Sequence, residues 1–114
     1  MDIDEKIDVE LNTAERSREA GNEGMARVCA RRAAGLAVRW FINQIGQDRP
    51  ELNNFELLSD PPLRDYLPTI TYLWLDHLSM RVDANHDLPG GIDLVADAKN
   101  VIRLLRQGGV KSNG

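Results

Sequence analysis

The chain has 114 residues, 42% of them hydrophobic but only two each of Phe, Tyr and Trp, and a formal net charge of −4 at pH 7. This size and composition predict one small domain with a mostly aliphatic core. The lone Cys29 excludes an internal disulfide, and no apolar run approaches the roughly 20 residues of a membrane span. We therefore expect a soluble, cytoplasmic domain over residues 1–107 and a frayed tail over residues 108–114.

Acidic and basic residues are concentrated in different parts of the sequence. Residues 1–24 contain eight acidic and three basic residues, whereas residues 25–49 contain five arginines and one aspartate. We expect the acidic segment to lie beside the arginine-rich one and to pair with it inside the molecule. The overall acidity argues against tight, nonspecific binding of nucleic acid, but it is compatible with a weak RNA contact.

The first predicted helix runs from Asp2 to Ala20. Asp2 is a suitable N-cap, and Gly21 with Asn22 ends the helix. Its apolar residues form a single thin stripe: Ile3, Ile7, Leu11 and Ala14. This helix should therefore bury only a narrow side.

The second predicted helix, from Glu23 to Gly46, carries the most informative pattern of the chain. At about 100° per residue, small residues gather on one side: Ala26, Ala30, Ala33 and Ala37. Cys29 belongs to the same side and is expected to be a small buried residue rather than a reactive thiol. The arginines spread over the other side and are predicted to form a solvated face: Arg27, Arg31, Arg32 and Arg39. The alanines should let a neighbouring helix approach closely.

A third helix is predicted to begin at Asp60, with that aspartate as N-cap and Pro61 in the first turn. Because Pro68 falls within it, either the helix kinks there or a short opening turn precedes a longer rod. One face of this helix is expected to join the core: Leu63, Tyr66, Leu67, Ile70, Leu73, Trp74, His77 and Leu78. Trp40 and Trp74 are interpreted as packing residues rather than as platforms for nucleic-acid bases.

The last predicted helix runs from Ile92 to Gln107, after the break at Pro89 to Gly91. Its expected core residues are Ile92, Val95, Ala96, Ile102 and Leu105. Short connections favour antiparallel neighbours. The predicted fold is therefore all-α, an up-and-down four-helix bundle.

Most enzyme classes lack their characteristic patterns in this sequence. One cysteine and two histidines cannot make a four-ligand zinc site without several carboxylates. Neither histidine has a glutamate three residues before it, which argues against a carboxylate-bridged di-iron site. There is no glycine-rich phosphate loop and no nucleophile with an evident base. We expect no metal and no cofactor.

One constellation with catalytic chemistry remains near the end of the third predicted helix. Arg81 and His86 are separated by four residues, and His77 lies one turn before Arg81. An arginine can hold a phosphate through two parallel hydrogen bonds, while a histidine can transfer the proton of a ribose hydroxyl or leaving group. These three residues are the candidate site for RNA cleavage without a metal.

These residues carry a resemblance to the HEPN superfamily over about residues 2–107. It rests on the stretch Ala30-Arg31-Arg32-Ala33-Ala34, on Arg81-x-x-x-x-His86, and on the last helix beginning Ile92-Asp-Leu-Val-Ala-Asp-Ala-Lys99. The resemblance implies an all-α bundle that commonly dimerises. In catalytic members it implies a metal-independent ribonuclease, often the toxin of a toxin-antitoxin pair, whose arginine and histidine meet across the dimer. Members without the motif serve as nucleotidyltransferase partners or interaction modules.

The same residues also have purely structural interpretations. His77 on an apolar stripe is typical of a core or interface histidine that a hydrogen bond satisfies. Arg81 near the middle of that stripe would need a carboxylate, which Asp93, Asp97 or a partner chain could supply. A straight helix turns about 140° between Arg81 and His86, so the two would share a substrate only across a bend or a second subunit.

Two functions stay open from the sequence. The first is a HEPN-like module, without catalysis, that forms a homodimer and associates with a protein partner. Tyr72 and Leu75 are its predicted interface, because they point away from the core stripe of the third helix. The alternative is a metal-independent endoribonuclease that uses Arg81 and His86 across the dimer.

Overall fold

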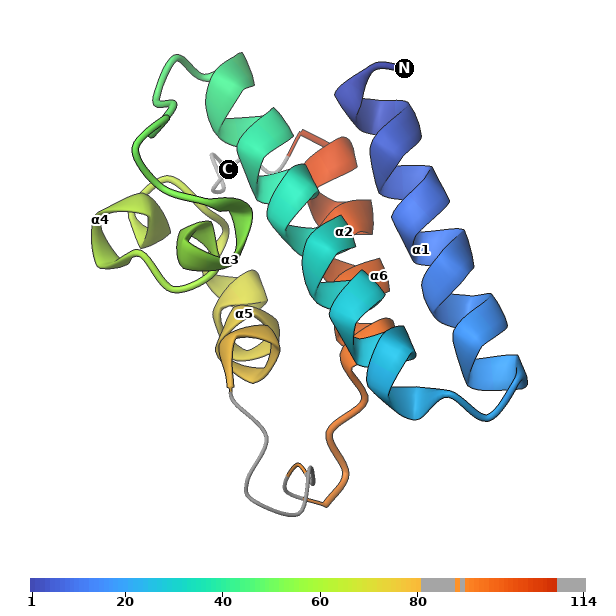
Figure 1. Ribbon diagram of the computed structural model, residues 1–114. Helices are drawn as coiled ribbons and strands as arrows, with labels where there is room; N and C mark the ends of the chain where they lie inside the picture. The colour runs from blue at the N-terminus through green and yellow to red at the C-terminus, as the bar shows by residue number, and fades with distance from the viewer. Residues whose placement is uncertain (81–87, 89, 109–114) are drawn as a thin grey trace.

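A computed structural model describes residues 1–80, 88 and 90–108, and this part of the chain is helical without any strand (Figure 1). The predicted all-α class is therefore confirmed. The longer helices are α1 (Ile3–Glu19), α2 (Glu23–Gln44), α5 (Tyr72–Ser79) and α6 (Leu94–Arg106). The short ones are α3 (Asn54–Leu57), α4 (Pro61–Arg64) and the 3-10 turn η1 (Thr69–Thr71).

Capping residues define the α1–α2 hairpin. The Asp2 side chain accepts a hydrogen bond from the Glu5 amide at 2.8 Å, as predicted, and the Asn22 side chain accepts one from the Met25 amide at 3.0 Å. Between the helices, Gly21 has a φ of 81°, a conformation that favours glycine. As a result α1 runs antiparallel beside α2 (Figure 1).

The acidic helix α1 contributes little to the core. It buries Ile7 and Ala14 completely, which confirms its thin apolar stripe. Its carboxylates pair chiefly with α6: Asp4 and Asp8 lie 2.8 and 2.9 Å from Arg106. Lys99 similarly pairs with α1, at 2.7 Å from Glu15. The prediction that the acidic residues of α1 form ion pairs inside the molecule is thus correct. Among the described ion pairs, however, the carboxylates of α1 pair with α6 and not with the arginines of α2.

Helix α2 lies at the centre of the fold, in contact with α1, α3, α5 and α6. The predicted alanine stripe is fully buried: Ala26, Ala30, Ala33 and Ala37. Burial extends farther around the helix than predicted and includes Ala34, Gly35 and Val38. Cys29 is also buried, and burial raises the pKa of its thiol, as expected of an unreactive cysteine. Helix α2 therefore exposes only a narrow strip.

Pro68 divides the predicted third helix into α4, η1 and α5, which matches the interpretation of a short opening turn before a longer rod. At Pro68 the backbone is extended, with ψ of 135°, so α5 begins in a new register. Leu63, Leu67 and Leu78 are buried as predicted. The prediction was wrong for three others, which are 43%, 63% and 61% exposed: Tyr66, Ile70 and Leu73. The helical periodicity does not continue across the break at Pro68.

Helix α6 closes the fold against α2 and α5. Val95, Ile102 and Leu105 are buried as predicted, whereas Ala96 is exposed. The neighbouring Asp97 is buried instead, at 8% exposure, because it has a polar partner on α5. Of the tail predicted to be frayed, residues 109–114 lie outside the described part of the chain.

Candidate functional site

The predicted catalytic residues Arg81 and His86 both lie outside the described residues. The third member of that set, His77, lies on α5, which ends at Ser79. The described part of the candidate site therefore lies at the carboxyl end of α5.

His77 and Asp97 form a close pair between α5 and α6. The Nδ1 atom of His77 lies 2.9 Å from Oδ2 of Asp97, and the two side chains are 20% and 11% exposed. Burial raises the pKa of the Asp97 carboxyl, and the hydrogen bond with His77 opposes this effect. The interpretation of His77 as a hydrogen-bonded, mostly buried histidine is thus confirmed. An aspartate at one ring nitrogen also orients the ring.

Asp93, at the start of α6, is bound by different partners. Its Oδ1 accepts hydrogen bonds at 3.1 Å from two backbone amides in the first turn of α6, so it is the N-cap of that helix. The Arg18 guanidinium lies 2.9 Å from the same oxygen. Both carboxylates proposed as partners for Arg81 therefore bind another residue here: Asp93 binds Arg18, and Asp97 binds His77.

Arg31 attaches the carboxyl end of α5 to α2. Its Nε and Nη2 atoms donate hydrogen bonds to the carbonyl oxygens of Leu78 and Met80, at 3.0 and 2.8 Å. Partial burial and the nearby charge of Arg27 lower the pKa of the Arg31 guanidinium. Its prediction as part of a solvated face was wrong, because the last carbonyls of a helix lack partners within the helix and attract a cation.

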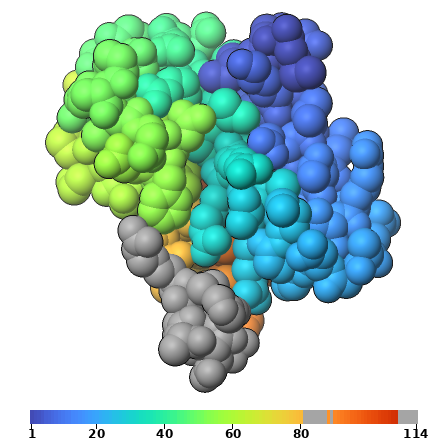
Figure 2. All heavy atoms as spheres, viewed as in Figure 1, coloured from blue at the N-terminus to red at the C-terminus, as the bar shows by residue number. Residues whose placement is uncertain are grey.

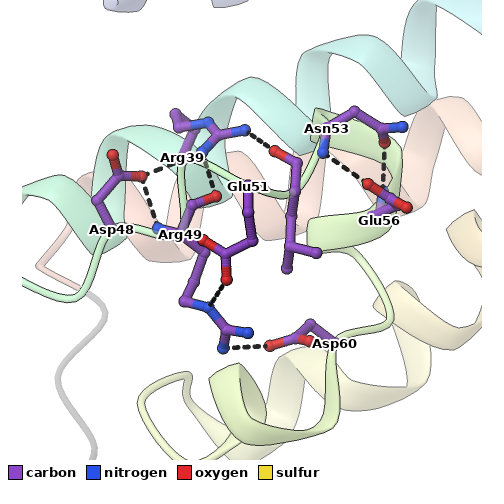
Figure 3. A network of polar contacts seen from close by, with 8 residues as sticks. Arg39, Asp48, Arg49, Glu51, Asn53, Glu56 and Asp60 are labelled. Carbon is purple, nitrogen blue, oxygen red and sulfur yellow. Dashed lines mark hydrogen bonds and ion pairs between the residues drawn. The ribbon is translucent and has the colours of Figure 1, made fainter.

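Arg39 likewise binds the connection that follows α2 (Figure 3). Its guanidinium donates to Oδ1 of Asp48 at 3.1 Å, to the Arg49 carbonyl at 3.0 Å and to Oδ1 of Asn54 at 3.2 Å. It also donates to the Leu52 carbonyl. One half-buried side chain thus holds an irregular segment against α2, so Arg39 was also wrongly assigned to a solvated face.

Arg49 and Asn53 extend this network. Arg49 pairs with Asp60 at 3.1 Å, and Asp60 is the N-cap residue of α4 without a side-chain capping bond. The predicted cap is thus in place, but its carboxylate binds an arginine instead. Asn53 and Glu56 form a reciprocal capping box at the start of α3 (Figure 3).

Arg32 differs from Arg31 and Arg39 because it is exposed and, within the described part of the chain, forms no hydrogen bond or ion pair. It lies between Val28 and Leu36 at intervals of four residues, so the three share one line along α2. Figure 2 shows that part of α2 is visible at the surface between α1 and the segment that carries α3. We call this strip and its two walls the α2 groove.

Two hollows occupy the α2 groove, and both are lined by Arg32 and Asn54. The larger, about 370 Å³, lies toward α1 and includes Lys6, Val9 and Leu36 in its lining. The smaller, about 190 Å³, lies toward α3 and is lined further by Val28, Arg31 and Phe55. The groove therefore combines apolar walls with exposed positive charge.

The predicted interface residues do not form an exposed patch. Leu75 is completely buried, and Tyr72 is half-buried, with its hydroxyl donating to the Arg64 carbonyl. The expectation that these two side chains lack a partner within the chain was wrong, because the break at Pro68 rotates α5. Their neighbours Ile70 and Leu73 are exposed in their place.

The sequence did not predict that Arg31 and Arg39 bind backbone carbonyls of later segments. The helical angle places the arginines of α2 on one face but does not predict where later loops contact that face. A signal was present for the loop itself, since Asn53 followed three residues later by Glu56 is a capping-box pattern.

No protein-family model, curated protein or solved structure matches this chain. Within residues 1–80, 88 and 90–108, no group of three or more histidine, cysteine, aspartate or glutamate side chains is placed to hold a metal ion. In the same residues, every helix is too short or too polar to cross a bilayer.

Proposed function

We propose that this chain is a HEPN-type interaction module, a four-helix bundle of up-and-down type that forms a homodimer and binds a protein partner without catalysis. The observation that carries this proposal is the α2 groove. The walls include Val9 and Phe55, and the strip between them includes Val28. Arg32, on the same strip, forms no hydrogen bond or ion pair among the residues that the structure describes. Exposed apolar surface beside unpaired charge is typical of a protein-binding site.

The polar groups of the fold support a binding function over a catalytic one. Arg31 and Arg39 bind backbone carbonyls, and the carboxylates of Asp93 and Asp97 each have a partner. These groups stabilise the fold, so they are not available to hold a substrate phosphate. Arg32 in the α2 groove remains available for an external ligand.

A cleavage assay tests this proposal. The purified protein would be incubated with structured and single-stranded RNA in the presence of a metal chelator, together with Arg81→Ala and His86→Ala variants. We expect no cleavage by any of the three proteins. Cleavage by the parent protein that is lost in both variants would establish the enzyme and overturn the proposal.

A second candidate function, metal-independent RNA cleavage, is favoured by one observation. Asp97 holds Nδ1 of His77 at 2.9 Å, an arrangement that orients a histidine for proton transfer from Nε2. In this alternative His77 would assist Arg81 and His86. A His77→Gln variant that folds normally but loses cleavage, with a changed pH profile, would favour the enzyme.

A further inference from the structure

We propose that the α2 groove binds an acidic, amphipathic segment of a partner protein. This inference rests on the proposed function and adds the chemistry of the partner. In it, an aliphatic or aromatic side chain of the partner enters a hollow on one side of Arg32, and a partner carboxylate pairs with the Arg32 guanidinium.

The charge of the groove selects an anionic ligand. Lys6, Arg31 and Arg32 line the two hollows, against the single carboxylate of Glu10. Arg31 uses its donors on two carbonyl oxygens, which are neutral, so its positive charge is not cancelled there. This local excess of cations stands on a protein whose net charge is −4. A carboxylate arriving at Arg32 can form a bidentate pair of hydrogen bonds with its guanidinium.

The shape and lining of the groove select an apolar anchor beside that carboxylate. The strip Val28, Arg32 and Leu36 alternates apolar and cationic groups along one line of α2, and Phe55 forms the wall on the α3 side. Hollows of about 370 and 190 Å³ have room for side chains of the leucine or phenylalanine type. Val9 and Val28, at 49% and 37% exposure, would become buried.

The same features favour a protein over RNA as the occupant. Single-stranded RNA is held by a continuous cationic track and by several aromatic side chains on which bases stack. The groove supplies one aromatic residue, Phe55, among the residues that line its two hollows. An acidic peptide can instead direct its carboxylates toward Arg32 and its apolar side chains toward Val28 and Leu36.

A display experiment tests this inference. Random 12-residue peptides would be selected on the full-length protein, and enriched peptides would be synthesised and measured by fluorescence anisotropy. The same measurements would use Arg32→Glu, Val28→Glu and the matched control Arg103→Glu, an exposed arginine on α6 whose side chain contacts Asn100. Circular dichroism would verify that each variant is folded, and a single-stranded RNA oligonucleotide would be measured in parallel.

We expect enriched peptides to combine Asp or Glu with Leu, Ile, Phe, Met or Trp, and to bind with salt-sensitive affinity. Binding should fall about tenfold or more in Arg32→Glu and Val28→Glu, and change less than about twofold in Arg103→Glu. Peptide binding that is unaffected by both groove variants would overturn the α2 groove as the binding site, while leaving a protein-binding function intact. Absence of any selected peptide, or RNA binding that depends on Arg32, would overturn both.

Discussion

Gly35 allows the chain to pass closer to α2 than any other residue would permit. A Cβ atom at this position would lie 2.7 Å from the backbone oxygen of Asn54 and 2.9 Å from its Cβ. Asn54 in turn lines both hollows of the α2 groove and accepts a hydrogen bond from Arg39. One missing side chain therefore fixes the distance between α2 and α3.

Replacing Gly35 by alanine should destabilise the protein by about 1–3 kcal/mol, because the new methyl group overlaps backbone that Arg39 holds in place. Gly24→Ala is the matched control on the same helix: its nearest neighbour would be Oδ1 of Asn22 at 3.9 Å. That substitution should be neutral or stabilising by up to about 1 kcal/mol. Urea unfolding measures both free energies, and equal effects would contradict the close approach.

Asp97→Asn should become relatively more stable as the pH rises. Burial raises the pKa of the Asp97 carboxyl above its ordinary 3.8, although His77 opposes and Asp93 reinforces the shift. The native state then holds this proton more tightly than the unfolded chain. The stability that the protonated Asp97 carboxyl contributes is fully present below the ordinary pKa. It is lost as the pH rises through the raised pKa.

The difference in unfolding free energy, Asp97→Asn minus native, should therefore increase from about pH 4 to about pH 5.5, below the ordinary range of histidine. Urea titrations at several pH values measure it. A flat or falling difference over this interval would show that pairing with His77 outweighs burial.

At the scale of elements, arginines of α2 hold the segments that follow it. Arg31 binds the end of α5, and Arg39 binds the connection from Asp48 to Asn54. These segments have few regular hydrogen bonds of their own, so the guanidinium groups satisfy carbonyl oxygens that helices would otherwise pair. The helices α3 and α5 thus depend on α2 for their positions.

Arg39→Ala should cost about 2–4 kcal/mol, because several acceptors lose a charged donor at once. Arg32→Ala on the same helix should change the stability by less than about 0.5 kcal/mol, since an exposed arginine without partners contributes little. Chemical denaturation of the two variants under identical conditions makes this comparison. Similar losses in both would contradict the network seen in Figure 3.

Features that depend on neighbouring residues could be predicted from the sequence. Features that depend on contacts between distant parts of the chain could not. The alanine stripe of α2, the cap at Asp2 and the break at Pro68 follow from neighbouring residues, and all three are observed. The exposure of Leu73 and the burial of Leu75 depend on how α5 rotates after Pro68, which no local pattern specifies. The pairing of His77 with Asp97 likewise needs the packing of α5 on α6.

At the scale of the whole molecule, the homodimer proposed above would need a contact other than Tyr72 and Leu75, which are half-buried and buried. Ile70 and Leu73, at 63% and 61% exposure, are more exposed than any other large apolar side chain of the described residues except Met1. They lie three residues apart and therefore on one side of the η1–α5 segment. A second copy could bury both.

Leu73→Glu should convert a dimer into a monomer, because association would bury an unpaired charge. Sedimentation velocity over a range of concentrations measures the change. Ile45→Glu, at an exposed apolar residue beyond α2, is the control and should leave the dimer intact. A native protein that is monomeric throughout the range would remove the homodimer from the proposed function.

The central position of α2 has a consequence for how the protein opens. The helices α1, α5 and α6 all contact α2. The middle turns of α2 can therefore become exposed to water only when the whole molecule unfolds. Amide protons near Ala33 and Ala34 should accordingly be the last to exchange with deuterium, at a rate set by global unfolding. Motions confined to α4 or η1 would leave that protection unchanged. Movement of these short elements on binding of a partner would therefore not open α2.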